Sequence, residues 1–187
     1  MVLKKAKLKA ADFFLRKLAK EKKRKPLAVG IDQAKSIGII FDASEKENLE
    51  IIKKYVSSLK EEKKKVQVLG YYNLKELPFE LNSKLDYDYF SKKDVNWHLR
   101  PNNAVITNFA NEPFDILLNL TTDIVLPIQY VFVMSKANFK IGRASAKHLP
   151  FYDLSIEAKE ESGLKQLIDI FTKYLKMIHS KNQQSLI

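Results

Sequence analysis

The sequence lacks several residues and patterns on which whole classes of function depend. It has no cysteine in 187 residues, which excludes disulfide bonds, thiolate metal ligands and a cysteine nucleophile. Its five glycines never fall in a G-x-G-x-x-G or Walker A spacing, so a standard dinucleotide or P-loop site is not expected. No serine stands in a G-x-S-x-G motif and no histidine pair has the helical spacing of a zinc site. We therefore expect no metal and no cofactor.

Long hydrophobic runs are also missing. The longest apolar stretch, residues 124–134, is interrupted by Pro127 and Gln129. It is far shorter than the roughly 20 residues of a membrane-spanning helix. The basic N-terminus is not followed by the continuous apolar region of a signal peptide. These features lead us to expect a soluble, cytoplasmic protein.

Negative charge is scarce at the N-terminus. Asp12 and Glu21 are the only acidic residues among the first 25, which contain eleven lysines and arginines. This segment therefore carries a net charge of +9, out of +11 for the whole chain. Concentrated positive charge stabilises complexes with phosphate-rich partners. The distribution indicates a polyanion-binding segment joined to a nearly neutral body.

The basic segment has the periodicity of an amphipathic helix over residues 3–24, if each residue turns the helix by about 100°. Its apolar side comprises Leu8, Ala11, Phe14, Leu15 and Leu18, and its basic stripe comprises Lys5, Lys9, Arg16, Lys20 and Lys23. Pro26 disfavours helix at the preceding residue and should end it. We expect residues 1–25 to form this helix and residues 26–187 to form a single domain that folds without it.

The rest of the chain alternates between strand and helix patterns. Strands are predicted at 37–41, 65–72, 85–89, 114–120, 139–141 and 151–156, and helices after residue 44 and at 103–110, 127–136 and 164–178. Ser44 and Glu47 have the spacing of a capping box for the first of these helices. In the 85–89 strand, aspartates alternate with apolar residues, which predicts one wet face. The alternation predicts a three-layer, Rossmann-like α/β domain with a largely parallel sheet, preceded by the basic helix.

Four stretches carry a resemblance to known proteins: SIGIIFDAS (36–44), DYFSKKDVNW (88–97), FDILLNL (114–120) and SKANFKIGR (135–143). Over about residues 5–175 they resemble an uncharacterised family of short Bacteroidetes proteins, a domain of unknown function. This resemblance implies no activity. The strand at 114–120, the helix after it and residues 136–143 are also similar, at the level of fold alone, to the Rossmann-like halves of glycosyltransferases.

Residues 86–101 mix aromatic rings with positive charge. Lys92, Lys93, Trp97 and Arg100 are the residues of this segment that a single-stranded nucleic acid would use, because bases stack on rings and phosphates pair with cations. The alternative is structural: Trp97 closes the edge of the core, and the two lysines pair with Asp94.

A second group of polar residues follows the predicted strands. In open α/β sheets, ligands bind at the carboxyl ends of strands, where Asp42, Ser44, Thr121 and Arg143 are expected, with Asp94 nearby. Ser44 and the first amides of its helix are suited to holding an anion. The competing interpretation is helix capping and solvated charge at the ends of elements.

These features support three functions. The first is a non-catalytic RNA-binding or ribosome-associated factor whose partner is RNA or a ribosomal particle. The alternative is a Rossmann-like enzyme that acts on a nucleotide or nucleotide sugar. A further alternative is an adaptor for anionic membranes, because basic amphipathic helices also lie on anionic lipid. In each case the apolar side of the helix packs on the body, on a protein partner or on a membrane.

Overall fold

The computed structural model describes residues 2–22, 24–78, 81, 85–145, 151–159 and 162–178. The elements are α1 (Val2–Glu21), β1 (Ser36–Asp42), α2 (Lys46–Glu61), β2 (Lys65–Tyr72), β3 (Tyr87–Ser91), the 3₁₀ helix η2 (Lys92–Asp94), α3 (Ala104–Asn111), β4 (Ile116–Leu120), α4 (Leu126–Met134), β5 (Phe139–Arg143), β6 (Leu154–Ile156) and α5 (Leu164–Met177). The predicted alternation of strands and helices is therefore confirmed, with boundaries that differ by a few residues.

The six strands form one sheet in the order β3-β2-β1-β4-β5-β6, and every neighbouring pair is parallel. This is the strand order of the Rossmann fold, and it confirms the predicted α/β class. The order reverses between β1 and β4, which are neighbours in the sheet although two strands separate them in the chain. Ligand crevices of such sheets lie at this switch point, outside the carboxyl ends of the strands.

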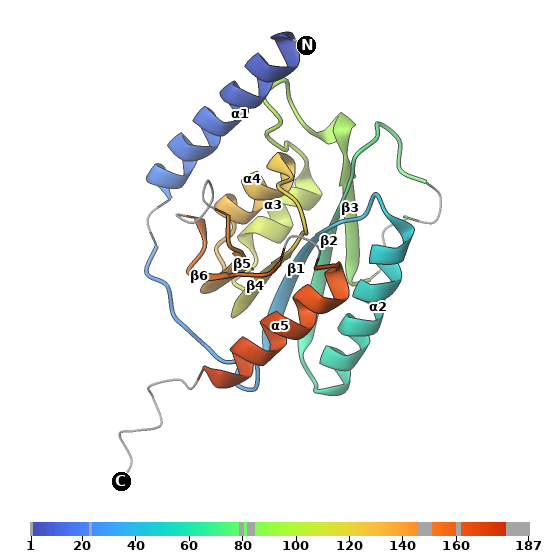
Figure 1. The fold of residues 1–187 in the computed structure, drawn as a ribbon, viewed down its shortest axis with the longest axis vertical. Helices are drawn as coiled ribbons and strands as arrows, with labels where there is room; N and C mark the ends of the chain where they lie inside the picture. The colour runs from blue at the N-terminus through green and yellow to red at the C-terminus, as the bar shows by residue number, and fades with distance from the viewer. Residues whose placement is uncertain are drawn as a thin grey trace.

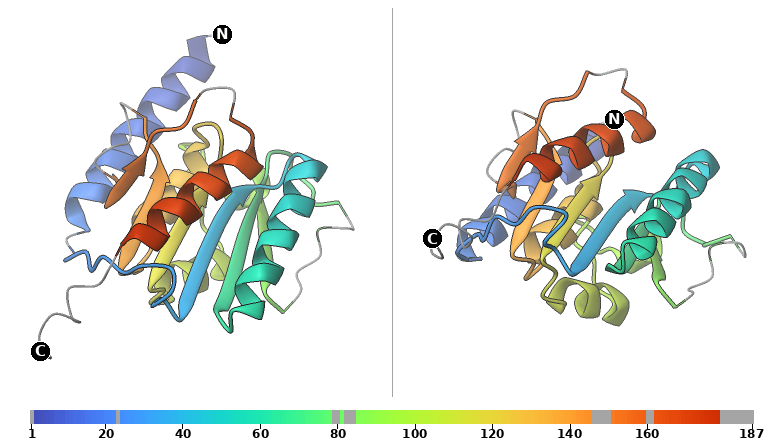
Figure 2. Two further views of the ribbon diagram at one scale, coloured as in Figure 1. Left: turned by 60° about the horizontal axis from the view of Figure 1, so that its bottom comes forward. Right: turned by 90° about the horizontal axis from the view of Figure 1, so that it is seen from below.

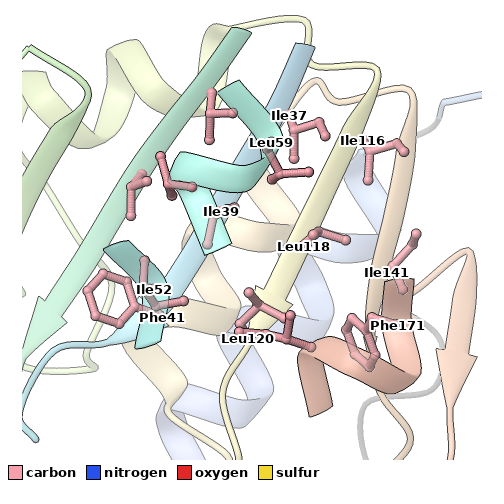
Figure 3. Packing of buried hydrophobic residues seen from close by; sticks show 14 of the residues in the cluster. Ile37, Ile39, Phe41, Ile52, Leu59, Ile116, Leu118, Leu120, Ile141 and Phe171 are labelled. Atoms are coloured by element: carbon pink, nitrogen blue, oxygen red, sulfur yellow. The ribbon is translucent and has the colours of Figure 1, made fainter. Parts of the chain in front are cut away.

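Helices cover both faces of the sheet (Figures 1 and 2). On one face α2 and α5 cover apolar side chains of β1, β4 and β5, including Ile39 and Leu118, and α5 contributes Phe171 to the same cluster (Figure 3). On the other face α3 and α4 pack over Ile40 and Leu117. Strands buried on both faces explain why β1 and β4 are apolar at nearly every position, since neither side chain direction leads to water.

The predicted wet face of the third strand is found only in part: Asp86 and Asp88 are half-buried, and the burial continues beyond them. Tyr89 is buried among residues on the α2 side, and Phe90, which points the opposite way, is fully buried on the α3 side. Leu85, predicted to lie in this strand, precedes it and is fully exposed. The alternation of aspartates indicated less burial than is found, because α3 covers the face of β3 that carries Phe90.

Candidate nucleic-acid interface

The N-terminal helix is attached to the body through its apolar side. Ala11, Leu15 and Leu18 are buried against Tyr130 and Val133 of α4, so α1 forms an additional layer outside α4 (Figure 1). The Tyr130 hydroxyl also donates a hydrogen bond of 2.8 Å to the carbonyl oxygen of Ala11. These contacts fix which sides of α1 face solvent.

The basic stripe lies on the exposed side of α1. Lys5, Lys9 and Lys20 are exposed. Arg16 is half-buried, and its Nε donates to Asp12 Oδ2 at 2.9 Å, so part of its charge is balanced within the helix. Lys23 lies outside the described residues. The electrostatic part of the predicted interface therefore rests on the exposed lysines, to which the structure adds Lys17.

The structure brings the aromatic residues of α1 against the 95–101 loop. The ring of Phe14 lies 6.1 Å from that of Trp97 and 4.6 Å from that of His98, between ring centroids. Phe13 lies edge-on to Phe14 at 5.5 Å. Phe13 and Trp97 remain 65% and 63% exposed. We call this group of Phe13, Phe14, Trp97 and His98 the ring surface.

The loop that carries Trp97 is tightly held. Val95 and Pro101 form an antiparallel bridge at its base, and Asn96 N–H donates to the carbonyl of Arg100 at 3.0 Å. Asn96 Oδ1 accepts hydrogen bonds from the N–H groups of His98 and Arg100 at 3.1 and 3.0 Å. Leu99 has a positive φ of 65°, a conformation that costs energy in a residue with a side chain. A strained, hydrogen-bonded loop thus presents an exposed tryptophan at its tip.

His98 is neutral in this environment. Because Asn96 Oδ1 already accepts two backbone donors, Asn96 Nδ2 must donate to His98 Nε2, 3.1 Å away, which places the imidazole proton on Nδ1. Nδ1 is buried and has no hydrogen-bond partner among the described residues. Burial, and then the charge of Arg100, lower the pKa of His98. The positive charge of the surface therefore comes from lysine and arginine.

Asp94 organises the base of the same loop. Its Oδ2 accepts hydrogen bonds from the N–H and the hydroxyl of Ser91, at 2.8 and 3.2 Å, and its Oδ1 accepts one from Asn103 Nδ2 at 2.8 Å. Lys92 and Lys93 are exposed, and among the described residues neither forms a salt bridge, so the predicted pairing of these lysines with Asp94 is wrong. Arg100 is exposed as well.

The residues predicted at the carboxyl edge of the sheet do not form one cluster. Asp42 Oδ1 accepts the Ser44 N–H at 2.9 Å, and Ser44 Oγ accepts the Asn73 N–H from the loop after β2 at 3.0 Å. The predicted capping box at Ser44 is wrong, because the N-cap of α2 is Glu45, which makes no side-chain capping hydrogen bond. The Ser44 side chain thus joins the loops after β1 and β2, and the Asp42 side chain holds the turn that carries Ser44.

Thr121 and Arg143 line a pocket of about 840 Å³ at the ends of β4 and β5. The Arg143 guanidinium donates to the carbonyl oxygens of Thr122, Ala158 and Lys159, which holds the surrounding loops together. Among the described residues, Arg143 has no carboxylate partner. Its charge is therefore available to an anionic ligand, although its position is set by the backbone.

The same pocket has a buried polar wall that sequence reasoning missed. The Tyr152 hydroxyl is hydrogen-bonded to Gln129 and receives a hydrogen bond from Asn119 Nδ2 at 3.3 Å. Burial raises the pKa of Tyr152. Its ring fits only because residue 142 is glycine, where a Cβ would lie 2.2 Å from the ring. Gln129 and Asn119 are polar residues within apolar runs, and that interruption is the signal that marks them.

Within the part of the chain that the structure describes, no group of three or more histidine, aspartate or glutamate side chains could hold a metal ion.

The family described as "Family of unknown function (DUF6913)" matches residues 7–178. No curated protein and no solved structure is significantly similar to the chain. The predicted resemblance to a domain of unknown function is therefore confirmed, whereas the Bacteroidetes origin and the likeness to glycosyltransferases stay predictions.

Proposed function

Because the chain belongs to the DUF6913 family, whose function is unknown, we propose its role from its own residues: it binds single-stranded RNA without catalysis, as an RNA-binding or ribosome-associated factor. One observation carries the proposal. Phe14 of the basic helix lies against Trp97 of the 95–101 loop, so the two segments expected to bind RNA form one surface.

The composition of this surface suits a single strand. Exposed rings provide stacking platforms for bases of any sequence, and lysines beside them neutralise the phosphates between those bases. At about 100° per residue, Lys17 lies between Phe13 and Phe14 around the helix, and Lys20 lies beside Phe13. The bases of duplex RNA would not reach the rings, because those bases are stacked inside the RNA helix.

The test is the affinity for a fluorescently labelled oligouridine of about 12 nucleotides, measured by anisotropy. Trp97→Ala should weaken binding by about 1–3 kcal/mol, the usual contribution of one stacked base, or roughly 5- to 150-fold. If Lys5, Lys9, Lys17 and Lys20 each neutralise one phosphate, the logarithm of affinity should fall with the logarithm of salt concentration with a slope near about −3. Deleting α1 would uncover Tyr130 and Val133, so substitutions are the better perturbation.

Tyr174→Ala is the matched control. Tyr174 is an exposed aromatic residue of α5, on the opposite face of the sheet, and its loss should leave binding unchanged. Equal affinities of the wild-type protein and Trp97→Ala, with both proteins folded, would contradict the proposal. A double charge reversal at Lys17 and Lys20 should abolish binding without unfolding the protein, because both side chains are exposed.

A second candidate function is supported by the 840 Å³ pocket at the carboxyl ends of β4 and β5. Its volume is typical of small-molecule sites, and Arg143 and Tyr152 provide a cation and a buried hydroxyl. These features support, as a second proposal, an enzyme that acts on a nucleotide or nucleotide sugar. Asp42, Ser44 and Asp94 do not line this pocket, so the site would depend on Thr121 and Arg143 among the residues expected from the sequence.

The membrane alternative receives less support. The apolar side of α1, which would enter lipid, is buried on α4 at Ala11, Leu15 and Leu18. No helix in the described ranges is long and apolar enough to cross a bilayer. A cytoplasmic location and a protein partner for α1 remain predictions.

A further inference from the structure

A smaller pocket, of about 440 Å³, lies under the end of α1, apart from the ring surface. It is an open pocket lined by the last turn of α1, the segment that follows it, α4, β5 and residues 151–153. Its charged members are Lys22, Arg24, Lys140 and Asp153. The segment after α1 is held in place here, because Arg24 Nη1 and the Leu27 N–H both donate to the carbonyl oxygen of Asn138.

Lys140 is a buried lysine whose protonated form has an incomplete set of partners. The side chain is 3% exposed, and its Nζ donates to the carbonyl oxygens of Phe132 and Val133 at the end of α4, at 2.7 and 3.3 Å. The protonated group has three donors, and the third has no oxygen acceptor among the described residues; the centroid of the Phe132 ring lies 5.7 Å from Nζ. Burying a cation is costly unless an opposite charge compensates it.

The carboxylate in this pocket does not provide that compensation. Asp153 Oδ2 accepts from the Arg24 guanidinium and from the backbone N–H of Lys140 at 2.8 Å, so its charge is balanced by Arg24. Neither Lys140 nor Lys22 forms a salt bridge within the described part of the chain. Burial, and then Arg24 and Lys22, lower the pKa of Lys140 to about 7, and Asp153 opposes this shift.

We propose that this pocket binds a phosphate group, held by Lys140 from below and by Lys22 and Arg24 from the end of α1. Once Lys140 is protonated, Lys140 and Lys22 are two uncompensated cations, which match the dianion that a phosphate monoester is near neutral pH. Charge-assisted hydrogen bonds from ammonium and guanidinium groups are the usual contacts of bound phosphate. Small phosphate esters and the terminal phosphate of an RNA strand present this same chemistry.

Sulfate is the probe for the test, because it stays a dianion across the pH range in which Lys140 titrates. Calorimetric titration with sulfate at about pH 7.5, in buffers of different ionisation enthalpy, should show uptake of up to about 0.8 of a proton per ion bound, as Lys140 becomes protonated. The affinity should fall by up to about tenfold per pH unit above about pH 7. Absence of saturable sulfate binding would overturn the proposal.

Lys140→Met keeps the size of the side chain and should abolish both binding and proton uptake. Lys136→Met is the matched control, because Lys136 is an exposed lysine in the α4–β5 connection, four residues before Lys140, and it should change neither. Lys22→Met removes an exposed charge without touching the core and should weaken sulfate binding several-fold, which keeps the test valid if Lys140→Met folds poorly. Unchanged binding in Lys22→Met, or in folded Lys140→Met, would place the ion elsewhere and refute the site.

The source of the phosphate is decided by two further titrations. Tighter binding of uridine monophosphate than of uridine, lost in Lys22→Met, would assign the pocket to small phosphate esters. If only oligouridine shows the gain, with the 5′-phosphorylated strand binding more tightly than the 5′-hydroxyl strand, the pocket binds the end of an RNA strand. This oligouridine comparison alone rests on the proposed RNA binding. Trp97→Ala should leave sulfate binding intact. The RNA-binding proposal and the phosphate-site proposal can therefore fail independently of each other.

Discussion

The attachment of α1 to the body leads to a prediction about Leu15→Ala. Leu15 is fully buried between α1 and α4, in a cluster with Tyr130 and Val133. Removing a buried leucine side chain costs about 2–5 kcal/mol, because apolar contacts are lost and a cavity remains. For a protein of this length, that corresponds to a fall in Tm of about 4–20 °C. Leu8→Ala, at a position that is 42% exposed, should cost less than about 1 kcal/mol.

Two probes in one urea titration make this prediction sharp. The fluorescence of Trp97, the only tryptophan, reports the docking of α1 because Phe14 lies against its ring. Far-UV circular dichroism reports the secondary structure of the whole chain. If α1 belongs to the cooperative core, Leu15→Ala should shift both transitions equally to lower urea concentration.

The opposite outcome is equally clear. A Trp97 transition that precedes an unshifted circular dichroism transition would show that α1 undocks by itself. That result would refute the core role of α1 and support the sequence-based prediction that residues 26–187 fold without it. Leu8→Ala is the control for a general loss of helix in α1. If the Trp97 transition of Leu8→Ala keeps the wild-type urea midpoint, the early transition of Leu15→Ala comes from the lost contact with α4.

Two more predictions concern stability. The pKa of Lys140 is lowered to about 7 from an unfolded value of about 10.4, so the unfolded chain binds more protons between these values. Stability should therefore rise with pH across this window, by up to about 1.4 kcal/mol per pH unit, and Lys140→Met should flatten the rise in urea titrations between about pH 7.5 and 9.5. Gly142→Ala should destabilise the protein by about 1–3 kcal/mol, because the new Cβ would meet the Tyr152 ring at 2.2 Å. A thermal melt of Gly142→Ala that matches the wild type would show that Tyr152 moves aside freely.

Elements whose signals are local could be predicted from the sequence. The strand expected at 65–72 is found as Lys65–Tyr72, and the helix expected at 103–110 is found as Ala104–Asn111, capped by the Asn103 side chain. A local signal failed where a distant partner competed for the same atom. Ser44 has capping-box spacing, but α2 begins one residue later, with Glu45 as its N-cap, and the Ser44 hydroxyl accepts the Asn73 N–H instead. Spacing along the chain carries no information about that partner.

The candidate sites show the same division. The sequence indicates that the lysines of α1 and the ring of Trp97 are binding residues, because residue type and position along the chain are enough to recognise them. It does not show that Phe14, 83 positions before Trp97, lies against it, since that contact depends on how α1 packs on α4. It also does not distinguish Lys140 from the exposed lysines, because burial is a property of the folded sheet.

The position of α1 connects both proposed sites. Its apolar side is bound to α4, and this one attachment places Phe14 on Trp97 near the middle of the helix and Lys22 over Lys140 at its end. A ligand at either site would therefore add to the free energy that holds α1 on the body, because each ligand contacts both parts. It follows that oligouridine and sulfate should each raise the free energy of α1 undocking, and that Leu15→Ala should weaken both ligands together if α1 leaves the body as a unit. Substitutions confined to one site would weaken one ligand alone. If Leu15→Ala weakens both ligands, docking of α1 organises both sites. If it weakens neither, the two sites are independent of that docking.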